Sequence, residues 1–497
     1  MKKAQLLKEY GLYINGAWQA ATDAGTFITK DPASGEQLAV CAQATKEDVD
    51  YAVEKAWEAF KTWKHSTANE RAVILNKIAD VIDENAQHLA MVESLDNGKP
   101  IRETLASDIP NAAKHFRYFA GCIVADEGSA NMLEGDQLSL ILREPIGVVG
   151  QIVPWNFPLL MASWKLAPVL AAGCCTVFKP SSDTSLSVLE LARLLEGIIP
   201  PGVFNVITGS GSKSGQYMLD HEGFSKLAFT GSTEVGRNVA LAAAEKLIPA
   251  TLELGGKSAN IYFEDCQWDL ALDGLQLGIL FNQGEVCCAG SRIFVQDTIY
   301  DKFVEDAVKA FNKIKMGHSL EKETQMGSLV NEAQVNTVLK YVEIAKEEGA
   351  TIACGGKQIE GELKEGCFVG PTLITDVTND MRVAQEEIFG PVACVIKFST
   401  EEEVIAMAND SEYGLGGGVW TRDINRAIRV SRAVETGRMW VNTFNSAPAA
   451  APFGGYKTSG IGRETHKVAL DHYSQIKNIL INLSEDVSGF YPEDEKI

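Results

Sequence analysis

The sequence has little positive charge and no cluster of metal ligands. Only 45 of its 497 residues are Lys or Arg, against 66 Asp and Glu, so the net charge is −21. Such an acidic surface repels nucleic-acid phosphates and anionic lipid headgroups, and no basic patch offsets it. The ten cysteines include no Cys-x-x-Cys pair, and the seven histidines do not fall at metal-ligand spacing near them. We therefore expect no nucleic-acid partner, no metal and a reducing, cytoplasmic environment.

The sequence also lacks an apolar segment that reads as a membrane span or a signal peptide. Residues 145–164 carry no charge, but they contain three prolines and two glycines, which would free backbone groups that lipid cannot satisfy. We expect a buried strand, loop and helix there. The N-terminus begins basic, but charge returns at Lys8 and Glu9 before an apolar region can form, so no signal peptide is expected.

The length and the pattern of apolar runs predict an α/β fold with more than one domain. A chain of 497 residues is too long for a single ordinary core. Segments long enough for crossover helices separate short apolar runs at 146–153, 174–178, 203–207, 227–230 and 252–254. This alternation predicts a doubly wound parallel sheet, whose ligands lie beyond the carboxyl ends of the strands. A second α/β unit is expected from 259 to about 455.

Local signals predict several individual elements. Residues 13–18 indicate a short hairpin with Asn15-Gly16 as its turn. Thr45 and Asp48 form a capping-box-like helix start, and one further helix is expected over about 69–95. Amphipathic helices are expected over 300–314 and 331–345. Alternation at 137–142 and 477–483 predicts two strands that are far apart in sequence.

Four turns at the ends of these runs are candidate ligand sites, at 153–157, 179–182, 209–211 and 231–236. None has the usual G-x-G-x-x-G spacing, so this motif gives only weak support for a dinucleotide site. Gly231 and Ser232 open a predicted helix, where free N–H groups and the helix dipole favour an anion such as phosphate. A plain helix N-cap explains the same residues equally well.

Two adjacent cysteines, Cys287 and Cys288, follow an apolar run and lie among small, uncharged residues. A thiol beside glycines in a turn can present its sulfur to a cleft, so Cys287 is the candidate nucleophile. On this segment alone, a buried structural cysteine is the commoner explanation. Glu253 is the single acid in a strand-like run that ends in a glycine turn. A nucleophile with a separate acid suggests covalent catalysis.

Motifs along essentially the whole chain resemble those of the aldehyde dehydrogenase superfamily. They stand in the family's order at 154–158 (PWNFP), 179–180, 229–236, 252–258, 282–287, 386–391 and 452–464. The resemblance implies a doubly wound Rossmann-type coenzyme domain, an α/β catalytic domain and a small β oligomerisation arm. It places the dinucleotide-binding domain at 1–122 and 146–255 and the catalytic domain at 256–457. The arm and C-terminal segment would be 123–145 and 458–497.

The resemblance also assigns catalytic roles. Cys287 would attack the aldehyde carbon as a thiolate, and the oxyanion would lie between the Asn156 side-chain amide and the Cys287 backbone N–H. Hydride would then pass to the nicotinamide and leave a thioester. Glu253 would take a proton from the water that hydrolyses this thioester, and Glu464 resembles a relay for that proton.

Further positions match coenzyme and substrate contacts of the family. The expected coenzyme contacts are Ile152, Trp155, Lys179, Ser182, Gly231, Ser232, Gly236, Glu387 and Phe389. Among them, Lys179 and Glu387 look like ribose contacts, and Phe389 looks like a wall near the nicotinamide. The aldehyde tunnel would be lined by Phe157, Trp164 and Phe453 and would be apolar.

Ser182 departs from the family pattern. Many NAD-preferring members carry a glutamate three residues after the lysine that matches Lys179, and its carboxylate repels a 2′-phosphate. A serine there removes a unit of negative charge. We therefore expect the enzyme to accept NADP as well as NAD.

The chain ending at 462–473 looks like that of bacterial acetaldehyde dehydrogenases, which oxidise short aliphatic aldehydes. A homodimer or homotetramer is expected. Two alternatives remain: an acylating relative, in which coenzyme A or phosphate resolves the thioester, and a non-catalytic protein that has kept the fold. Glu253 argues against the first alternative, and Cys287, Asn156 and Glu253 together argue against the second.

Overall fold

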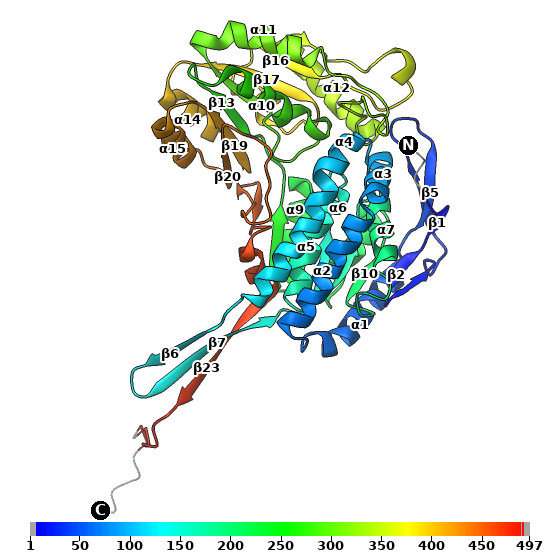
Figure 1. Ribbon diagram of the computed structural model, residues 1–497, viewed down its shortest axis with the longest axis vertical. Coiled ribbons are helices and arrows are strands. Elements are labelled where there is room, and N and C mark those ends of the chain that lie inside the picture. Colours follow the sequence, from blue (N-terminus) through cyan, green and yellow to red (C-terminus); the bar gives the residue numbers. More distant parts are fainter. Residues whose placement is uncertain (1–5, 489, 492–497) are drawn as a thin grey trace, which may run out of the picture.

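The computed structural model describes residues 6–488 and 490–491, and the outer ends of the expected segments 1–122 and 458–497 lie outside this part. Figure 1 shows two α/β units stacked along the long axis and a β arm that projects from the lower one. The strands of the first sheet are, in spatial order, β22 (Gly460–Ile461), β12 (Ala250–Glu253), β11 (Lys226–Thr230), β8 (Val148–Ile152), β9 (Cys175–Lys179), β10 (Phe204–Val206), β2 (Leu12–Ile14) and β3 (Ala17–Gln19). Its five central strands are parallel, as predicted.

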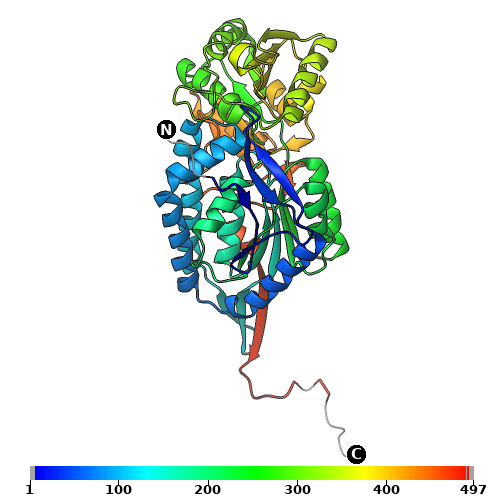
Figure 2. The same cartoon turned by 90° about the vertical axis from the view of Figure 1, so that its right-hand side faces the viewer.

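Helices flank this sheet on both sides: Figure 2 shows the lighter blue and cyan helices on one face, and one dark-blue helix beside the green helices on the other. They are α1 (Lys46–Trp63), α2 (Ala68–Glu84), α3 (Ala86–Asn97), α5 (Ile109–Val124), α6 (Pro158–Ala171), α7 (Leu186–Leu194), α8 (Gln216–Asp220) and α9 (Thr233–Glu245). The short α4 (Ile101–Glu103) and a π-helical turn at 104–108 lead into α5. The predicted capping box is confirmed, because Thr45 and Asp48 bond reciprocally at the start of α1. The predicted hairpin is confirmed in β2 and β3.

The single helix expected over 69–95 is wrong, because the chain breaks into α2 and α3 at Asn85. This residue leaves the helical region, with φ −109° and ψ 16°. Its side-chain Nδ2 donates to the Val81 carbonyl at 2.8 Å. Asparagine is a poor residue for a helix interior because its side chain competes in this way for backbone hydrogen bonds. α3 then ends at Gly98, whose φ of 95° suits glycine.

Two buried acids on α3 cap the starts of α6 and α7. A Glu93 carboxylate oxygen accepts from the Leu159 N–H at 3.0 Å, at the start of α6. An Asp96 oxygen accepts from the Leu186 N–H at 2.8 Å, at the start of α7. Both helices lack a side-chain cap from their own N-cap residue, so α3 supplies it from a distance. Burial raises the pKa of Glu93 to about 8 and that of Asp96 well above its ordinary value.

The second sheet holds the strands β15 (Thr351–Cys354), β16 (Thr372–Thr375), β17 (Val392–Phe398), β14 (Arg292–Gln296), β13 (Ala259–Tyr262), β19 (Gly416–Trp420) and β20 (Arg438–Val441) in that spatial order. All neighbours except β15 and β16 run parallel. The helices of this unit are α10 (Trp268–Leu280), α11 (Tyr300–Phe311), α12 (Glu332–Glu347), α13 (Arg382–Gln385), α14 (Glu401–Asn409) and α15 (Ile424–Ala433). The two amphipathic helices expected here are confirmed as α11 and α12.

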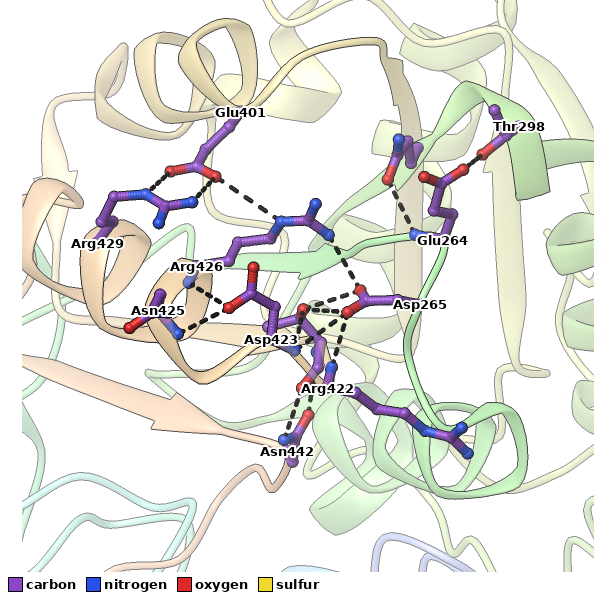
Figure 3. Close-up of polar contacts among 12 residues, drawn as sticks. Glu264, Asp265, Thr298, Glu401, Arg422, Asp423, Asn425, Arg426, Arg429 and Asn442 are labelled. Atoms are coloured by element: carbon purple, nitrogen blue, oxygen red, sulfur yellow. Dashed lines mark hydrogen bonds and ion pairs between the residues drawn. The ribbon is translucent and has the colours of Figure 1, made fainter.

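A polar network around Asp265 fixes the start of α15 in the second unit (Figure 3). The Asp265 carboxylate accepts from the Thr421 hydroxyl at 2.8 Å and from the backbone N–H groups of Arg422 and Asp423, each at 3.1 Å. The Arg426 guanidinium also donates to it, at 3.1 Å. One carboxylate therefore holds the turn that precedes α15.

The two strands predicted from alternation are confirmed, and they belong to the projecting arm. β7 (Gln137–Pro145) pairs with β23 (Ser474–Asn482) along its whole length, and β6 (Ser129–Leu133) adds a third strand that the sequence did not signal. Large apolar side chains on this arm are exposed, including Ile476, Leu480 and Met132. The role of the arm in assembly and the domain limits stay predictions.

Smaller sheets join β1 (Glu9–Tyr10), β5 (Gln37–Ala42) and β4 (Thr26–Lys30), and separately β18 (Tyr413–Gly414) and β21 (Tyr456–Lys457). Within the described residues, none of the helices combines the length and the apolar character that crossing a membrane requires.

We predict that Asp265→Ala destabilises the fold by about 1–3 kcal/mol, because it leaves the donors of the α15 turn without their acceptor. Thermal and urea unfolding of the purified variant measure this. Glu264→Ala is the matched control: its carboxylate is exposed and bonds the Thr298 hydroxyl at 2.9 Å, so its effect should stay within about 0.5 kcal/mol. Equal effects of the two substitutions would contradict this role of Asp265.

Candidate active site

A cavity of about 270 Å³ lies where β8, β11 and β12 end. This is the edge at which open parallel sheets bind ligands. Its lining includes eight of the residues expected from the sequence, namely Trp155, Asn156, Gly231, Ser232, Glu253, Cys287, Glu387 and Phe389. The other lining residues are Pro154, Met161, Thr230, Leu254, Gly255 and Gln334. The candidate nucleophile and the candidate base thus share one cavity.

A tight turn after α10 brings Cys287 to this cavity. Asn282 and Gln283 have φ of 49° and 56°, in the left-handed region, and Gly284 follows with φ 73°. A Cβ at Gly284 would lie 2.2 Å from the Gly390 carbonyl oxygen, so only glycine fits there. The turn reverses the chain within a few residues and leaves the Cys287 side chain partly exposed.

Hydrogen bonds tie this turn to the loop that carries Asn156. The Asn282 Nδ2 donates to the carbonyl oxygens of Asn156 and Glu285, each at 3.0 Å. The Asn156 Nδ2 donates to the same Glu285 carbonyl at 2.8 Å. One amide hydrogen of Asn156 is used in this contact, and the second remains for an oxyanion. The Lys99 Nζ donates to the Asn156 carbonyl at 2.6 Å and to Asp108 at 2.8 Å.

The surroundings of Cys287 favour its neutral form. A side-chain hydrogen bond with Cys288, burial, and the negative charges of Glu253 and Glu387 together raise the pKa of the Cys287 thiol well above its ordinary value. A neutral thiol is a poor nucleophile. The site therefore needs a positive charge, or loss of a negative one, before Cys287 reacts readily.

Glu253 is the last residue of β12 and is buried, with both carboxylate oxygens lacking a hydrogen-bond partner among the described residues. Burial, followed by the nearby charge of Glu464, raises its pKa well above the ordinary value. Glu464 itself is buried and accepts a hydrogen bond from the Lys165 Nζ at 2.6 Å. A buried carboxyl group without a hydrogen-bond partner, beside a buried ion pair, is suited to taking up and passing on a proton.

The opposite side of the cavity is formed by an aromatic pair and a helix start. The rings of Trp155 and Phe389 meet edge to face, with centroids 5.1 Å apart. Ser232 is the N-cap of α9, and its Oγ accepts from the Val235 N–H at 3.4 Å, so the N-cap interpretation is confirmed. An N-cap position does not exclude a phosphate-binding site, because the other backbone N–H groups of the first turn still point out of the helix start and can bind an anion. Gly236 lies outside the lining, at a point where a Cβ would meet Leu254 at 2.3 Å.

Glu387 also lines the cavity. One of its oxygens accepts from the Gly256 N–H at 2.9 Å, and burial raises its pKa to about 7. Gln334 also lines the cavity, and the sequence did not predict it as a site residue. It donates to the carbonyl oxygens of Phe389 at 2.7 Å and Ile388 at 3.1 Å and so holds the turn in which Phe389 has φ 59°.

The expected ribose contact Lys179, the expected coenzyme contact Ser182 and the cleft residue Ile152 lie outside the lining of this cavity. Lys179 ends β9, pairs with Ile152 in register and donates to the Pro180 carbonyl at 3.1 Å. Burial lowers the pKa of Lys179 to about 8, against the opposing charge of Asp183. Asp183 is a second missed residue, which no motif marks.

The aromatic residues expected in the aldehyde tunnel gather beside the cavity without lining it. The rings of Trp164 and Phe453 lie 5.1 Å apart, and Phe157 stacks on Phe281 at 5.9 Å. Their role toward a substrate stays a prediction. Met161 lines the cavity one helical turn before Trp164, and its place on the same face of α6 is the signal that finds it.

Comparison with known proteins decides the family. Residues 18–479 match the model described as "Aldehyde dehydrogenase family". The chain belongs to the aldehyde dehydrogenase family. Aldehyde dehydrogenase B of Escherichia coli (strain K12) is 47% identical over 495 residues, which cover 98% of this chain and 96% of that protein.

Solved structures agree with this family and with the expected fold. An NAD⁺ complex of an aldehyde dehydrogenase from Bacillus cereus has a TM-score of 0.94 and 45% identity, over 96% of this chain and 97% of that one. A betaine aldehyde dehydrogenase from Staphylococcus aureus in complex with NAD⁺ has a TM-score of 0.95 and 41% identity, over 98% of this chain and 97% of that one. The protein is thus an aldehyde dehydrogenase with the family's α/β fold.

We predict that alkylation of Cys287 in this aldehyde dehydrogenase is slow at neutral pH and keeps rising through about pH 9, because only the thiolate reacts and its pKa is raised. Iodoacetamide labelling followed by tandem mass spectrometry measures the rate and separates Cys287 from Cys288. Glu253→Gln removes one negative neighbour, so its profile should shift to lower pH. A wild-type plateau below about pH 8 would show that the thiol is already activated.

Proposed function

We propose that this aldehyde dehydrogenase oxidises a short aliphatic aldehyde, such as acetaldehyde, to the carboxylic acid, with NAD or NADP as coenzyme. The single observation that carries the proposal is one cavity lined by the Cys287 thiol, the Asn156 amide and the Glu253 carboxyl. The NAD⁺ complexes of the Bacillus and Staphylococcus relatives support the coenzyme.

The residues of the cavity fit a nicotinamide dinucleotide. Trp155 and Phe389 give apolar ring surfaces, and the start of α9 gives N–H groups for a phosphate. A Cβ at Gly255 would lie 2.4 Å from a Glu387 oxygen, so the chain approaches that carboxylate closely only because residue 255 is glycine. When bound, the coenzyme accepts the hydride that leaves the aldehyde carbon.

In the acylation half of the proposed reaction, Cys287 gives its proton to solvent water and its sulfur bonds to the aldehyde carbon. The carbonyl oxygen becomes an oxyanion, which the second Asn156 amide hydrogen and the Cys287 backbone N–H hold. Departure of hydride restores the carbonyl and leaves a thioester on Cys287. The hydrogen bond from Asn156 to the Glu285 carbonyl fixes the amide in place before the substrate arrives.

In the deacylation half, Glu253 as carboxylate takes a proton from water, whose oxygen attacks the thioester carbon. The C–S bond then breaks, the Cys287 thiolate leaves and the acid is released. The raised pKa of Glu253 means that deacylation accelerates as pH rises and the carboxylate forms. Glu464, paired with Lys165, would then receive the proton. Coenzyme A or phosphate as acceptor is the alternative, and a buried acid in the cavity favours water.

Assembly as a homodimer or homotetramer is part of this proposal. The arm of β6, β7 and β23 projects from the body and carries exposed apolar side chains (Figure 1). Exposed apolar surface of this kind marks protein interfaces.

We predict that Glu253→Gln still forms the thioester and releases a burst of reduced coenzyme, and that its steady turnover then collapses, because the amide cannot accept the proton. Stopped-flow absorbance at 340 nm with propanal follows both phases. Cys287→Ala is the matched control and should show neither. Full turnover by Glu253→Gln, or wild-type turnover that requires coenzyme A, would overturn hydrolysis as the second step.

The choice between NAD and NADP should depend on the charge near Lys179. Ser182 carries no charge, and Lys179 can attract a 2′-phosphate. Asp183 opposes this attraction, because its charge lies near the Lys179 ammonium. The structure thus adds one nearby acid, and we expect both coenzymes to be accepted because residue 182 itself brings no negative charge.

We predict that wild type uses NAD and NADP with kcat/KM values within about a hundredfold of each other, and that Ser182→Glu selectively weakens NADP. Steady-state kinetics with each coenzyme measures the ratio. Ser182→Gln introduces a side chain of nearly the same size as Glu but without the charge, so it should leave the ratio near the wild-type value. Outright rejection of NADP by wild type, or an unchanged ratio in Ser182→Glu, would remove Ser182 as the discriminator.

A further inference from the structure

Two buried rings, each with one free nitrogen atom of complementary hydrogen-bonding character, lie side by side near the candidate active site. His115 on α5 is 1% exposed and Trp164 on α6 is 5% exposed. Their ring centroids are 5.8 Å apart. Neither the His115 Nε2 nor the Trp164 Nε1 has a hydrogen-bond partner among the residues that the structure describes.

The hydrogen-bond network assigns one of these atoms as an acceptor and the other as a donor. The His115 Nδ1 lies 2.7 Å from the Asn111 carbonyl, which can only accept, so Nδ1 carries the hydrogen. Burial lowers the pKa of His115 to about 4, so the ring is neutral and Nε2 presents a lone pair. The indole Nε1 of Trp164 can only donate.

Buried polar groups in folded proteins are almost always paired, so two neighbouring unpaired groups point to a ligand. A hydroxyl group satisfies both at once, because its hydrogen donates to Nε2 while its oxygen accepts from the indole N–H. A purely apolar group would satisfy neither. A cation would have no acceptor at Trp164, and an anion would face the lone pair of Nε2.

The pair lies next to the cavity that holds Cys287. Met161 lines that cavity, and Trp164 follows it by one turn on the same face of α6. On its other side Trp164 contacts Phe453, with ring centroids 5.1 Å apart. To contact this pair, the far end of a short chain held at Cys287 must extend along this face of α6 toward Trp164.

We propose that His115 and Trp164 form a hydroxyl-binding subsite, and that the enzyme favours short hydroxyaldehydes over plain aliphatic aldehydes of the same length. This inference rests on the proposed function and names its substrate class. It makes His115 and Trp164 specificity-determining residues.

The test compares kcat/KM for propanal, 2-hydroxypropanal and 3-hydroxypropanal in wild type, His115→Leu and Trp164→Phe. Two hydrogen bonds to one hydroxyl should give wild type a preference of about tenfold or more for one hydroxyaldehyde over propanal. Both variants should lose most of this preference, and His115→Leu should keep its propanal kcat/KM within about threefold. Trp63→Phe is the matched control. It removes an indole N–H that donates to the Cys174 carbonyl away from this site, so it should leave the preference unchanged.

Circular dichroism and melting temperature check that each variant is folded. His115→Gln keeps a polar side chain that can accept a hydrogen bond, and partial recovery of the preference would support the proposal where His115→Leu fails to fold. A wild-type ratio near one for both hydroxyaldehydes would overturn the proposal, and so would a crystal structure with a hydroxyaldehyde bound in which a water molecule stays between the two nitrogens. Loss of propanal oxidation in wild type would instead count against the proposed function.

Discussion

The candidate site depends on the buried ammonium of Lys99. It is fully buried at the junction after α3, bonds Asp108 and the Asn156 carbonyl, and lies 4.1 Å from the centre of the Phe157 ring. Desolvating an ammonium is expensive, so these partners must stay in place, and breaking such a buried pair typically costs about 3–5 kcal/mol. Because Asn156 and the Cys287 turn share the Glu285 carbonyl, one charge holds both halves of the chemistry in register.

The same burial that fixes the site also suppresses its reactivity. Cys287, Glu253 and Glu387 all have raised pKa values, partly because burial penalises each anion and partly because the acids repel the thiolate. An oxidised nicotinamide ring carries a positive charge, and in the proposed reaction it would enter among these groups. Its arrival would lower the free energy of the thiolate when the hydride acceptor is in place, which limits side reactions of a free thiol.

The sequence predicts the elements that local rules control. The parallel strands, the Asn15-Gly16 hairpin and the Thr45 capping box follow from periodicity and turn chemistry, and all are present. The break at Asn85 was missed because the apolar spacing continues through it. The motifs name Cys287, Glu253 and Asn156, and the structure brings them to one cavity. Contacts across long sequence separations, such as Lys165 with Glu464, have no local signal.

The residues that support the site from behind are therefore set by the fold, and no sequence motif marks them. Asp183 lies in a loop near Lys179, Lys165 on α6 bonds Glu464, and Gln334 on α12 bonds the Phe389 carbonyl. Only the packed fold brings these supporting residues near the predicted ones. His115 is the extreme case, since its i−4 bond to Asn111 is local but its neighbour Trp164 comes from the next helix. A motif describes the chemistry common to a family, whereas the proposed substrate choice rests on two residues that lie far apart in sequence. Such pairs become recognisable only when burial and hydrogen bonding are counted atom by atom.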